Sequence, residues 1–417
     1  MKKKIIPIVL LAAAVLAGCD KNKGFQEDLS EEDAELKAAV EQYVPGVIYS
    51  IYGTLADETT DLCDLFAEAK TKAKNSTLVQ ADIDAIAAKF LRAREYWEKS
   101  EAFLYGAASD FGIDPHIDDW PLDLNVLSKT LSNNVLMKDL DDFGADKISS
   151  VGESSLGFHG LEYILFRDGK VRGVADITSG ETIVSETDEG VEESYVVTGI
   201  NELIFAAAVA EDLRNACWRL HVCWDPGAPA ERISYISDEL ELPYTSGGSA
   251  YTYGESLLRT GLVGGIHEFW TEASTKIFVS GMQNICNEVA HTKIATANSQ
   301  NEEGVHDSSY IESPYSKNSY RDFLDNILSI QYSLYGKADS DTPVDASFIN
   351  FLKKHNSALG GKLESALAGA KASLQACIDR GVAFVDDPTA DCASNAIEKI
   401  DALNNVLGEA ADYISRL

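Results

Sequence analysis

Apolar residues recur at steps of three and four along most of this chain, and that spacing constrains its fold more than any other feature. The stretch 77–105 shows the pattern, with one face formed by Ile83, Ala87, Phe90, Arg94, Trp97, Glu101 and Leu104. This is the spacing of an α-helix that packs one side into a bundle. Comparable patterns occupy about residues 31–43, 47–74, 201–224, 256–297, 317–335, 345–384 and 391–416, with Pro45-Gly46 as an expected interruption. The sequence therefore predicts an all-α fold.

The chain of 417 residues is longer than one hydrophobic core usually serves, so two domains are expected. Residues 171–200 differ from the rest because they are rich in Gly, Ser, Thr and acidic residues, with a few alternating valines. We interpret them as a connecting excursion, either irregular or folded into a small hairpin. The predicted organisation is an N-terminal helical-bundle domain over 31–170 and a C-terminal helical-bundle domain over 201–417, each similar to a four-helix bundle.

The N-terminus has the pattern of a bacterial lipoprotein signal. A basic region over 2–4 precedes an apolar run over 5–16 and the motif Leu16-Ala17-Gly18-Cys19. The apolar run is too short for a permanent membrane span, and small residues before a cysteine fit cleavage in front of it. A plain signal peptide with an incidental cysteine is the alternative. We expect a signal peptide over 1–18, lipidation of Cys19, a tether over 19–30 and a body attached to a membrane of the cell envelope, facing the periplasm or the cell surface.

The formal net charge of −32 bears on possible partners. It disfavours nucleic acid, because proteins bind nucleic acid by neutralising its phosphates with Lys and Arg. An acidic surface also attracts cations, but it does not define a site for them.

Six cysteines follow Cys19, and their spacing matches no CxxC or zinc-binding motif. Cys377 and Cys392 flank a predicted helix-helix turn that contains Pro388, so a disulfide between them is geometrically conceivable in an oxidising compartment. Buried free thiols are the other possibility. The remaining four are Cys63, Cys217, Cys223 and Cys286.

Two charged residues, Arg94 and Glu101, fall within the apolar face of the stretch 77–105. A lone charge in a packed interface is costly unless it is paired or bound to something, so each is expected to have a partner. The pair could fix the register of neighbouring helices or serve a binding site. A rotated helix whose charged side chains reach water is a further alternative.

The motif Gly157-Phe158-His159-Gly160-Leu161-Glu162 places an imidazole and a carboxylate one helical turn apart. Nitrogen and oxygen ligands of this kind suit iron or a borderline divalent ion, and helical bundles build such sites from inward Glu and His side chains. Two glycines within a helix cost about 1 kcal/mol each relative to alanine, which indicates a close approach of backbone or ligand. A hydrogen-bonded surface pair is the alternative for His159 and Glu162.

This motif resembles the signature of the imelysin family, a group of bacterial envelope proteins classed with metallopeptidases and linked to iron acquisition. Four further segments are similar to that family over nearly the whole chain after Cys19. They are the helix with Ala93-Arg94-Glu95-Tyr96-Trp97 and Glu101-Ala102-Phe103, the run Ile117-Asp118-Asp119-Trp120-Pro121-Leu122-Asp123, and the motifs Gly281-Met282-Gln283-Asn284-Ile285 and Glu312-Ser313-Pro314-Tyr315-Ser316.

The resemblance implies two helical-bundle domains with the site near the place where they meet. It makes His159, Glu162 and Glu101 the candidate metal ligands, with Arg94, Glu312 and Gly157 as neighbouring residues. The implied function is binding of a metal ion in uptake or storage, with iron as the expected metal and zinc as the alternative. Proteins of iron transport are then possible partners, besides the membrane reached through Cys19.

Two other functions stay open at this point. A metal-dependent peptidase is one, but a zincin helix needs His-Glu-x-x-His, and the pair His267-Glu268 has Thr271 where the second histidine belongs. Glu162 could in principle activate metal-bound water. The other is a surface scaffold or adhesin, in which the motif over 157–162 is only a packing feature.

Overall fold

The computed structural model describes residues 29–187, 190–299, 306–307 and 309–417. The predicted signal peptide, Cys19 and most of the predicted tether lie outside this part of the chain. Helices dominate the described residues and only two small antiparallel sheets accompany them, so the prediction of an all-α fold is confirmed. Within the described residues, no helix has both the length and the apolar character needed to cross a membrane.

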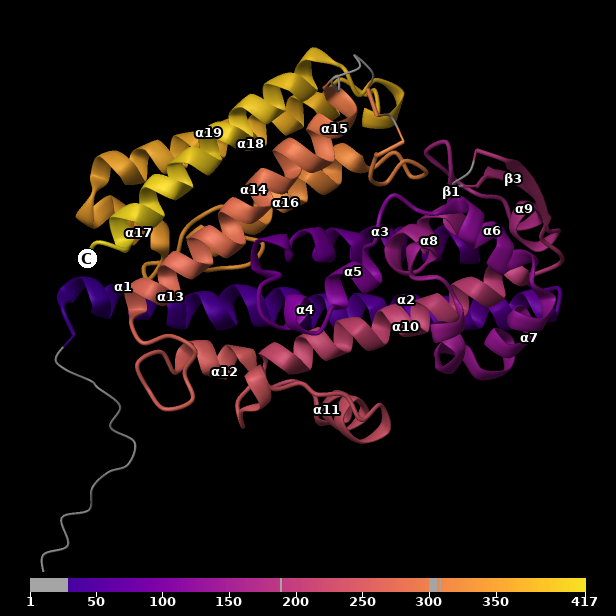
Figure 1. The fold of residues 1–417 in the computed structure, drawn as a ribbon, viewed down its shortest axis with the longest axis horizontal. Helices are drawn as coiled ribbons and strands as arrows, with labels where there is room; N and C mark the ends of the chain where they lie inside the picture. Colours follow the sequence, from indigo (N-terminus) through magenta and orange to yellow (C-terminus); the bar gives the residue numbers. More distant parts are fainter. Residues whose placement is uncertain (1–28, 188–189, 300–305, 308) are drawn as a thin grey trace, which may run out of the picture.

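A single long rod begins the fold (Figure 1). It consists of α1 (Glu31–Tyr43), the π-helical segment η1 (Val44–Tyr49) and α2 (Ser50–Lys74). The expected interruption at Pro45-Gly46 is therefore wrong, because the chain passes through these residues in a wider helical turn. Gly46 instead allows the backbone near Gly336 to pack closely against this helix, because a Cβ atom at position 46 would lie 2.5 Å from the carbonyl oxygen of Gly336.

The first half of the chain surrounds α2 with shorter elements. The expected single helix over 77–105 is wrong at its end, because α3 (Gln80–Glu98) stops before the 3-10 turn η2 (Glu101–Phe103). The following elements are α4 (Ala107–Asp110), α5 (Ile113–Ile117), α6 (Leu124–Ser132), α7 (Asn134–Phe143), η3 (Gly144–Ser150), η4 (Glu153–Ser155) and α8 (Gly157–Leu165).

The strands of the structure lie within and just before the predicted excursion over 171–200. Strands β1 (Phe166–Arg167) and β2 (Lys170–Val171) form a short ribbon, and α9 (Val174–Thr178) follows. Strands β3 (Thr182–Glu186) and β4 (Glu192–Val196) pair antiparallel, with Thr182 opposite Val196. The expectation of a small hairpin is thus confirmed.

Helix α10 (Asn201–Trp224) lies along α2 and packs against α8. The predicted helix over 256–297 is wrong in part, because a loop over 259–269 interrupts it. After this loop, three short α-helices alternate with two π-helical segments. The predicted helix over 345–384 is likewise divided at Asn356. The remaining elements are α11 (Ala230–Ser234), η5 (Tyr235–Glu239), η6 (Ser246–Gly248), α12 (Tyr253–Leu258), α13 (Trp270–Lys276), η7 (Ile277–Gln283), α14 (Asn284–Asn287), η8 (Glu288–Ile294), α15 (Ala295–Asn298), α16 (Ser319–Tyr335), α17 (Phe348–His355), α18 (Ser357–Asp379), η9 (Phe384–Asp386) and α19 (Asp391–Ile414).

One large apolar core joins both halves of the described chain. It extends from Leu36 in α1 to Ile414 in α19 and includes Trp97 and Trp224 among its largest buried side chains. The proposed division into domains over 31–170 and 201–417 stays a prediction. The six cysteines that follow Cys19 are free thiols in the structure, and all except Cys392 are buried.

Candidate metal site

A cluster of charged side chains lies buried at the centre of the molecule. Within the described residues it comprises six carboxyl groups, one imidazole and two permanent cations. The carboxyl groups are those of Glu98, Glu101, Asp118, Glu162, Glu312 and Asp322, the imidazole is that of His159, and the cations are Arg94 and Lys293. Each of these residues is less than a tenth exposed. The elements that carry them are α3, η2, the end of α5, α8, η8, the segment before α16, and α16 itself.

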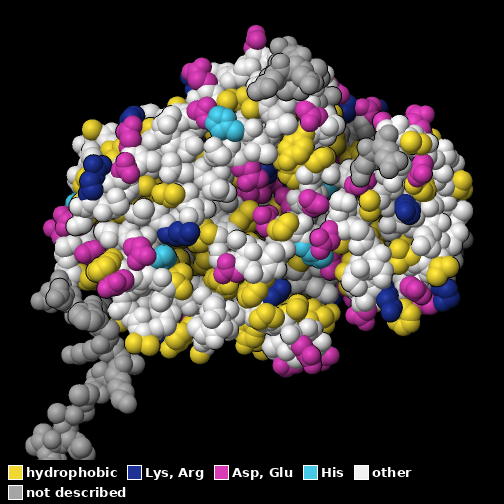
Figure 2. Space-filling model, in the orientation of Figure 1, with side chains coloured by type: hydrophobic (Ala, Val, Ile, Leu, Met, Phe, Trp, Pro, Cys, Tyr) yellow, Lys and Arg dark blue, Asp and Glu magenta, His cyan; other side chains and the backbone are white. Residues whose placement is uncertain are grey.

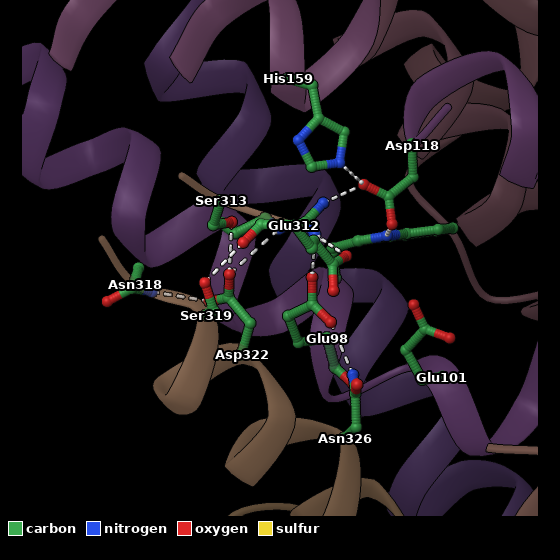
Figure 3. Close-up of polar contacts among 12 residues, drawn as sticks. Glu98, Glu101, Asp118, His159, Glu312, Ser313, Asn318, Ser319, Asp322 and Asn326 are labelled. Atoms are coloured by element: carbon green, nitrogen blue, oxygen red, sulfur yellow. Dashed lines mark hydrogen bonds and ion pairs between the residues drawn. The ribbon is translucent and has the colours of Figure 1, made fainter. Parts of the chain in front are cut away.

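Arg94 is 1% exposed and contacts four carboxyl groups of the cluster, those of Glu98, Asp118, Glu312 and Asp322, which are labelled in Figure 3. Its two terminal nitrogens form ion pairs with Asp118, with Glu312 and, one turn further along α3, with Glu98. Its Nε atom lies 3.9 Å from a carboxylate oxygen of Asp322. The partner expected for Arg94 is therefore a ring of carboxylates from four separate segments of the chain.

His159 and Glu162 both point inward from α8, whose nine residues are all buried. The Nδ1 atom of His159 lies 3.8 Å from Oε2 of Glu162, and its Nε2 atom lies 3.0 Å from Oδ1 of Asp118. Glu162 is also held from outside the helix, since its Oε1 accepts hydrogen bonds from the backbone N–H and the hydroxyl of Ser316, at 2.7 and 2.6 Å. The alternative of a surface pair is thus excluded by the burial of both side chains.

Gly157 explains how Asp118 comes so close to His159. Its φ of +60° lies in the left-handed region, and a Cβ atom there would meet the carbonyl oxygen of Ile117 at 2.0 Å. A side chain at position 157 would therefore push away the backbone that leads into Asp118. The indole N–H of Trp97 fixes Asp118 from the other side with a hydrogen bond of 2.6 Å to Oδ2.

The segment before α16 supplies Glu312 and several hydrogen-bond donors. The backbone carbonyl of Glu312 accepts a hydrogen bond from the hydroxyl of Ser319. Asp322 accepts one from the hydroxyl of Ser313 and one from the amide of Asn318. One short segment therefore orients carboxyl groups both on itself and on the helix that follows.

Lys293 brings a second cation from the π-helical segment η8. Its ammonium lies 3.2 Å from Glu312, 3.6 Å from Glu101 and 3.7 Å from Glu98. Glu98 also accepts a hydrogen bond from the amide of Asn326. This arrangement places Glu101 next to Lys293 and Glu98.

Burial and neighbouring charges shift the protonation equilibria of the cluster in opposite directions. Burial alone would lower the pKa of His159, but the carboxylates of Asp118 and Glu162 raise it to about 9. Burial raises the pKa of Glu98 to about 7, against the opposing effect of Arg94 and Lys293. Burial also acts to raise the pKa of Asp118, yet the nearby Arg94 and His159 hold it well below its usual range. The cluster thus contains carboxyl groups that favour their protons beside one that stays ionised.

The arrangement has more carboxyl groups than cationic groups, even with His159 protonated. Buried charge without compensation is costly, so a further cation fits this position. Oε2 of Glu312 and Oε2 of Glu162 are buried and have no hydrogen-bond partner among the described residues. Ligand atoms of Asp118, His159 and Glu312 lie within 4.8 Å of one another, which suits a metal ion. On the outside, acidic side chains gather in a hollow near the middle of the face shown in Figure 2.

The structure brings most of the predicted site residues together. Arg94, Glu101, His159, Glu162 and Glu312 all belong to the cluster, and Gly157 lies at its edge. Within the cluster, Glu101 converges with Glu98 and Asp118, whereas His159 and Glu312 converge with Asp118. Their roles as ligands or neighbours stay predictions. The sequence reasoning missed four members of the cluster, namely Asp118, Glu98, Asp322 and Lys293.

A usable signal existed for two of the missed residues. Asp118 belongs to one of the segments that carry the family resemblance, and Glu98 lies four residues after Arg94, on the same side of α3. Lys293 and Asp322 lie in patterns that look like ordinary amphipathic helix. Only the fold shows that these two side chains point into the cluster.

Comparison with known proteins gives a consistent result. The imelysin family model matches residues 48–409 of the chain. Iron-regulated protein A of Synechococcus elongatus is 25% identical over 127 residues, which are 30% of this chain and 31% of that protein. The match therefore spans less than a third of that relative's length.

Two solved structures have a similar fold. A protein named as an iron-regulated protein A precursor from Parabacteroides distasonis superimposes with a TM-score of 0.67 at 21% identity, over 93% of this chain and 96% of that one. An imelysin-like protein from Psychrobacter arcticum gives a TM-score of 0.58 at 12% identity, over 94% of this chain and 98% of that one. At these identities the likeness concerns the fold alone.

Proposed function

This chain belongs to the imelysin family, as its motifs predict, and on that basis we propose that it binds a metal ion, iron, in uptake or storage at the cell envelope. The candidate ligands are Asp118, His159 and Glu312, with Glu162 beside His159 as a fourth group. Arg94 orients the carboxylates of Asp118 and Glu312 without taking part as a ligand. A lipid on Cys19 would hold the protein at a membrane, and proteins of iron transport would be its partners.

The excess of buried carboxyl groups over cations is the observation that carries this proposal. Such an excess destabilises a fold unless protons or a cation neutralise it. The buried Oε2 atoms of Glu312 and Glu162 have no hydrogen-bond partner in the described part of the chain, and they would be free to coordinate a bound ion. The ion would also be held by side chains from distant segments, as buried sites in helical bundles commonly are.

The donor set favours iron or zinc over calcium and magnesium. It combines an imidazole nitrogen with carboxylate oxygens, whereas calcium and magnesium prefer oxygen alone. The name of the Synechococcus relative, iron-regulated protein A, supports iron as the choice between the two. Zinc remains the alternative to be measured beside it.

The first prediction concerns the metal content of the purified protein. We expect about one equivalent of iron or zinc in the tagless protein prepared without chelator, and a loss of most of it in His159→Ala. His291→Ala is the matched control, since His291 is exposed and pairs with Asp401 at 2.9 Å outside the cluster. Elemental analysis by mass spectrometry measures all three proteins. Equal metal content in the wild type and His159→Ala would refute the site.

A further inference from the structure

The cluster contains a second group of converging carboxylates. Ligand atoms of Glu98, Glu101 and Asp118 lie within 4.8 Å of one another, as do those of Asp118, His159 and Glu312. Asp118 belongs to both groups. Two cation positions that share one carboxylate are the arrangement found in two-metal sites, where the ions lie about 3.5–4 Å apart. The geometry therefore raises the question of what occupies the second position.

Two cations reach this second group: Arg94 pairs with Glu98 and Asp118, and the ammonium of Lys293 is the cation that lies next to Glu101. It is 1% exposed and lies 3.6 Å from Glu101, 3.7 Å from Glu98 and 3.2 Å from Glu312. Three carboxyl groups therefore surround this ammonium, and opposite charges at such distances favour its charged form.

Glu101 gives an independent indication that this position needs a proton or a cation. The residue is 4% exposed, and none of the described residues donates a hydrogen bond to its carboxyl group. Figure 3 shows Glu101 apart from the network of dashed contacts. Among the described residues, its carboxylate forms an ionic contact with the ammonium of Lys293. Without that ammonium, Glu101 would be a buried carboxyl group with no partner among the described residues.

We propose that Glu98, Glu101 and Asp118 form a second cation subsite and that the Lys293 side chain is its built-in occupant. This inference rests on the proposed function, because it assumes that a metal ion binds at Asp118, His159 and Glu312. Lys293 then limits the protein to one metal ion. Removal of its ammonium opens the second subsite to a small divalent cation.

The surrounding structure explains why Lys293 can reach this position. It lies in η8, a π-helical segment of the continuous helical stretch from α13 to α15, where the wider turn changes the direction of successive side chains. Glu312 accepts its hydrogen bond at 3.2 Å, which fixes the ammonium between the two groups of carboxylates. A neutral side chain of similar length, such as methionine, would fill the same space without the charge.

The second prediction is a change in metal stoichiometry. The metal-free wild type, titrated with Mn²⁺ in a calorimeter, is expected to bind one ion, and Lys293→Met is expected to bind two. Lys276→Met is the matched control, because Lys276 lies on the same helical stretch but is exposed, and it should bind one. In Lys293→Met, electron paramagnetic resonance should show the coupled spectrum of two neighbouring Mn²⁺ ions. The double variant Lys293→Met/Glu101→Gln should return to one ion.

The possible failures are distinguishable. One ion in both the wild type and Lys293→Met overturns the inference and leaves the proposed function intact, and two ions in the wild type overturn it as well. A wild type that binds no Mn²⁺, Fe²⁺ or Zn²⁺ refutes the proposed function itself. Should Lys293→Met fail to fold by circular dichroism, Lys293→Gln provides the same comparison with a polar side chain.

Discussion

Asp325 in α16 is a buried acidic residue near the charged cluster but outside it. It is 3% exposed, and its Oδ2 atom has no hydrogen-bond partner among the described residues. Burial raises its pKa to about 8, with Lys99 opposing the shift and Glu95 adding to it. The group therefore keeps a proton at pH values where an exposed aspartate is ionised, and ionising it costs stability.

The third prediction follows from the sign of this shift. A folded-state pKa above the unfolded value of about 3.9 means that the stabilising contribution of the protonated group is complete below that value and is lost as the pH rises through about 8. Asp325→Asn removes the ionisable group. It should be more stable than the wild type at pH 8, by about 1 kcal/mol or more, with a smaller difference at pH 5.

Urea unfolding at the two pH values tests this prediction. Asp379→Asn is the control, because Asp379 is exposed at the end of α18 and should change the pH dependence little. An identical slope of stability with pH in the wild type and Asp325→Asn would show that the carboxyl group ionises freely.

At the scale of single elements, glycines determine how closely the parts of the site approach. Gly157 and Gly160 lie against the carbonyl oxygens of Ile117 and Ser155, where a Cβ atom would come within 2.0 and 2.2 Å. Gly281 in η7 has the same relation to Ala102, at 2.1 Å. The last contact presses the second half of the chain against the turn that carries Glu101. The close approach inferred from the two glycines of the motif is thus a contact between backbones.

The fourth prediction compares glycines that look alike in the sequence. Gly157→Ala combines a left-handed φ with a backbone clash and should destabilise the protein by roughly 2 kcal/mol or more. Gly361→Ala is the control, because Gly361 lies in α18 with no heavy atom within 4 Å of the added Cβ. It should be neutral or stabilising by up to about 1 kcal/mol. Thermal unfolding measures both, and equal losses would contradict the assigned role of Gly157.

Helical periodicity predicted the class of the fold and the positions of most long helices, but not where they break. Pro45-Gly46 looks like a helix end, yet the chain stays helical there, and the carbonyl of Gly46 accepts a hydrogen bond from the backbone N–H of the distant Ala338. Conversely, the regular spacing up to Leu104 continues beyond the actual end of α3 at Glu98. Periodicity shows which residues are buried, but it does not show whether they lie on a helix. The turn after α3 also buries its residues, so the apolar spacing continues past the end of the helix.

The site could be predicted only as far as its local motifs reach. His159 and Glu162 are one turn apart, so their convergence follows from helix geometry. The contacts of Lys293 with Glu98 and Glu101 join residues far apart in the sequence, and they arise from tertiary packing. The sequence alone shows no signal for such contacts.

At the scale of the whole molecule, the charged cluster connects the first half of the chain with the second half. Arg94 from the first half of the chain forms its ion pairs with Asp118 and Glu98 in that half and with Glu312 in the second half. These contacts lie within the apolar core, where water does not screen them. Loss of the guanidinium would leave several buried carboxylates without their main partner.

The fifth prediction tests this connection by comparing two arginines of α3. Arg94→Met should lower the free energy of unfolding by about 3–5 kcal/mol, as expected when one partner of a buried ionic network is removed. Arg92→Met should lower it by less than about 1 kcal/mol, because the Arg92 side chain is 43% exposed and its ion pair with Glu95 is near the surface. Urea unfolding of both variants gives the comparison, and similar losses would show that Arg94 does not hold the two halves together.

The rod formed by α1, η1 and α2 extends from one end of the molecule to the other (Figure 1). Its first part packs against α13 and α17, and its last part packs against α3 and α10. A hinge between the two ends would have to bend this uninterrupted helix, whereas binding proteins that close around a ligand bend at a few loop residues. Admission and release of an ion would then depend on small side-chain rotations within rigid walls. Slow exchange of this kind suits a protein that retains its cargo more than one that passes it on rapidly.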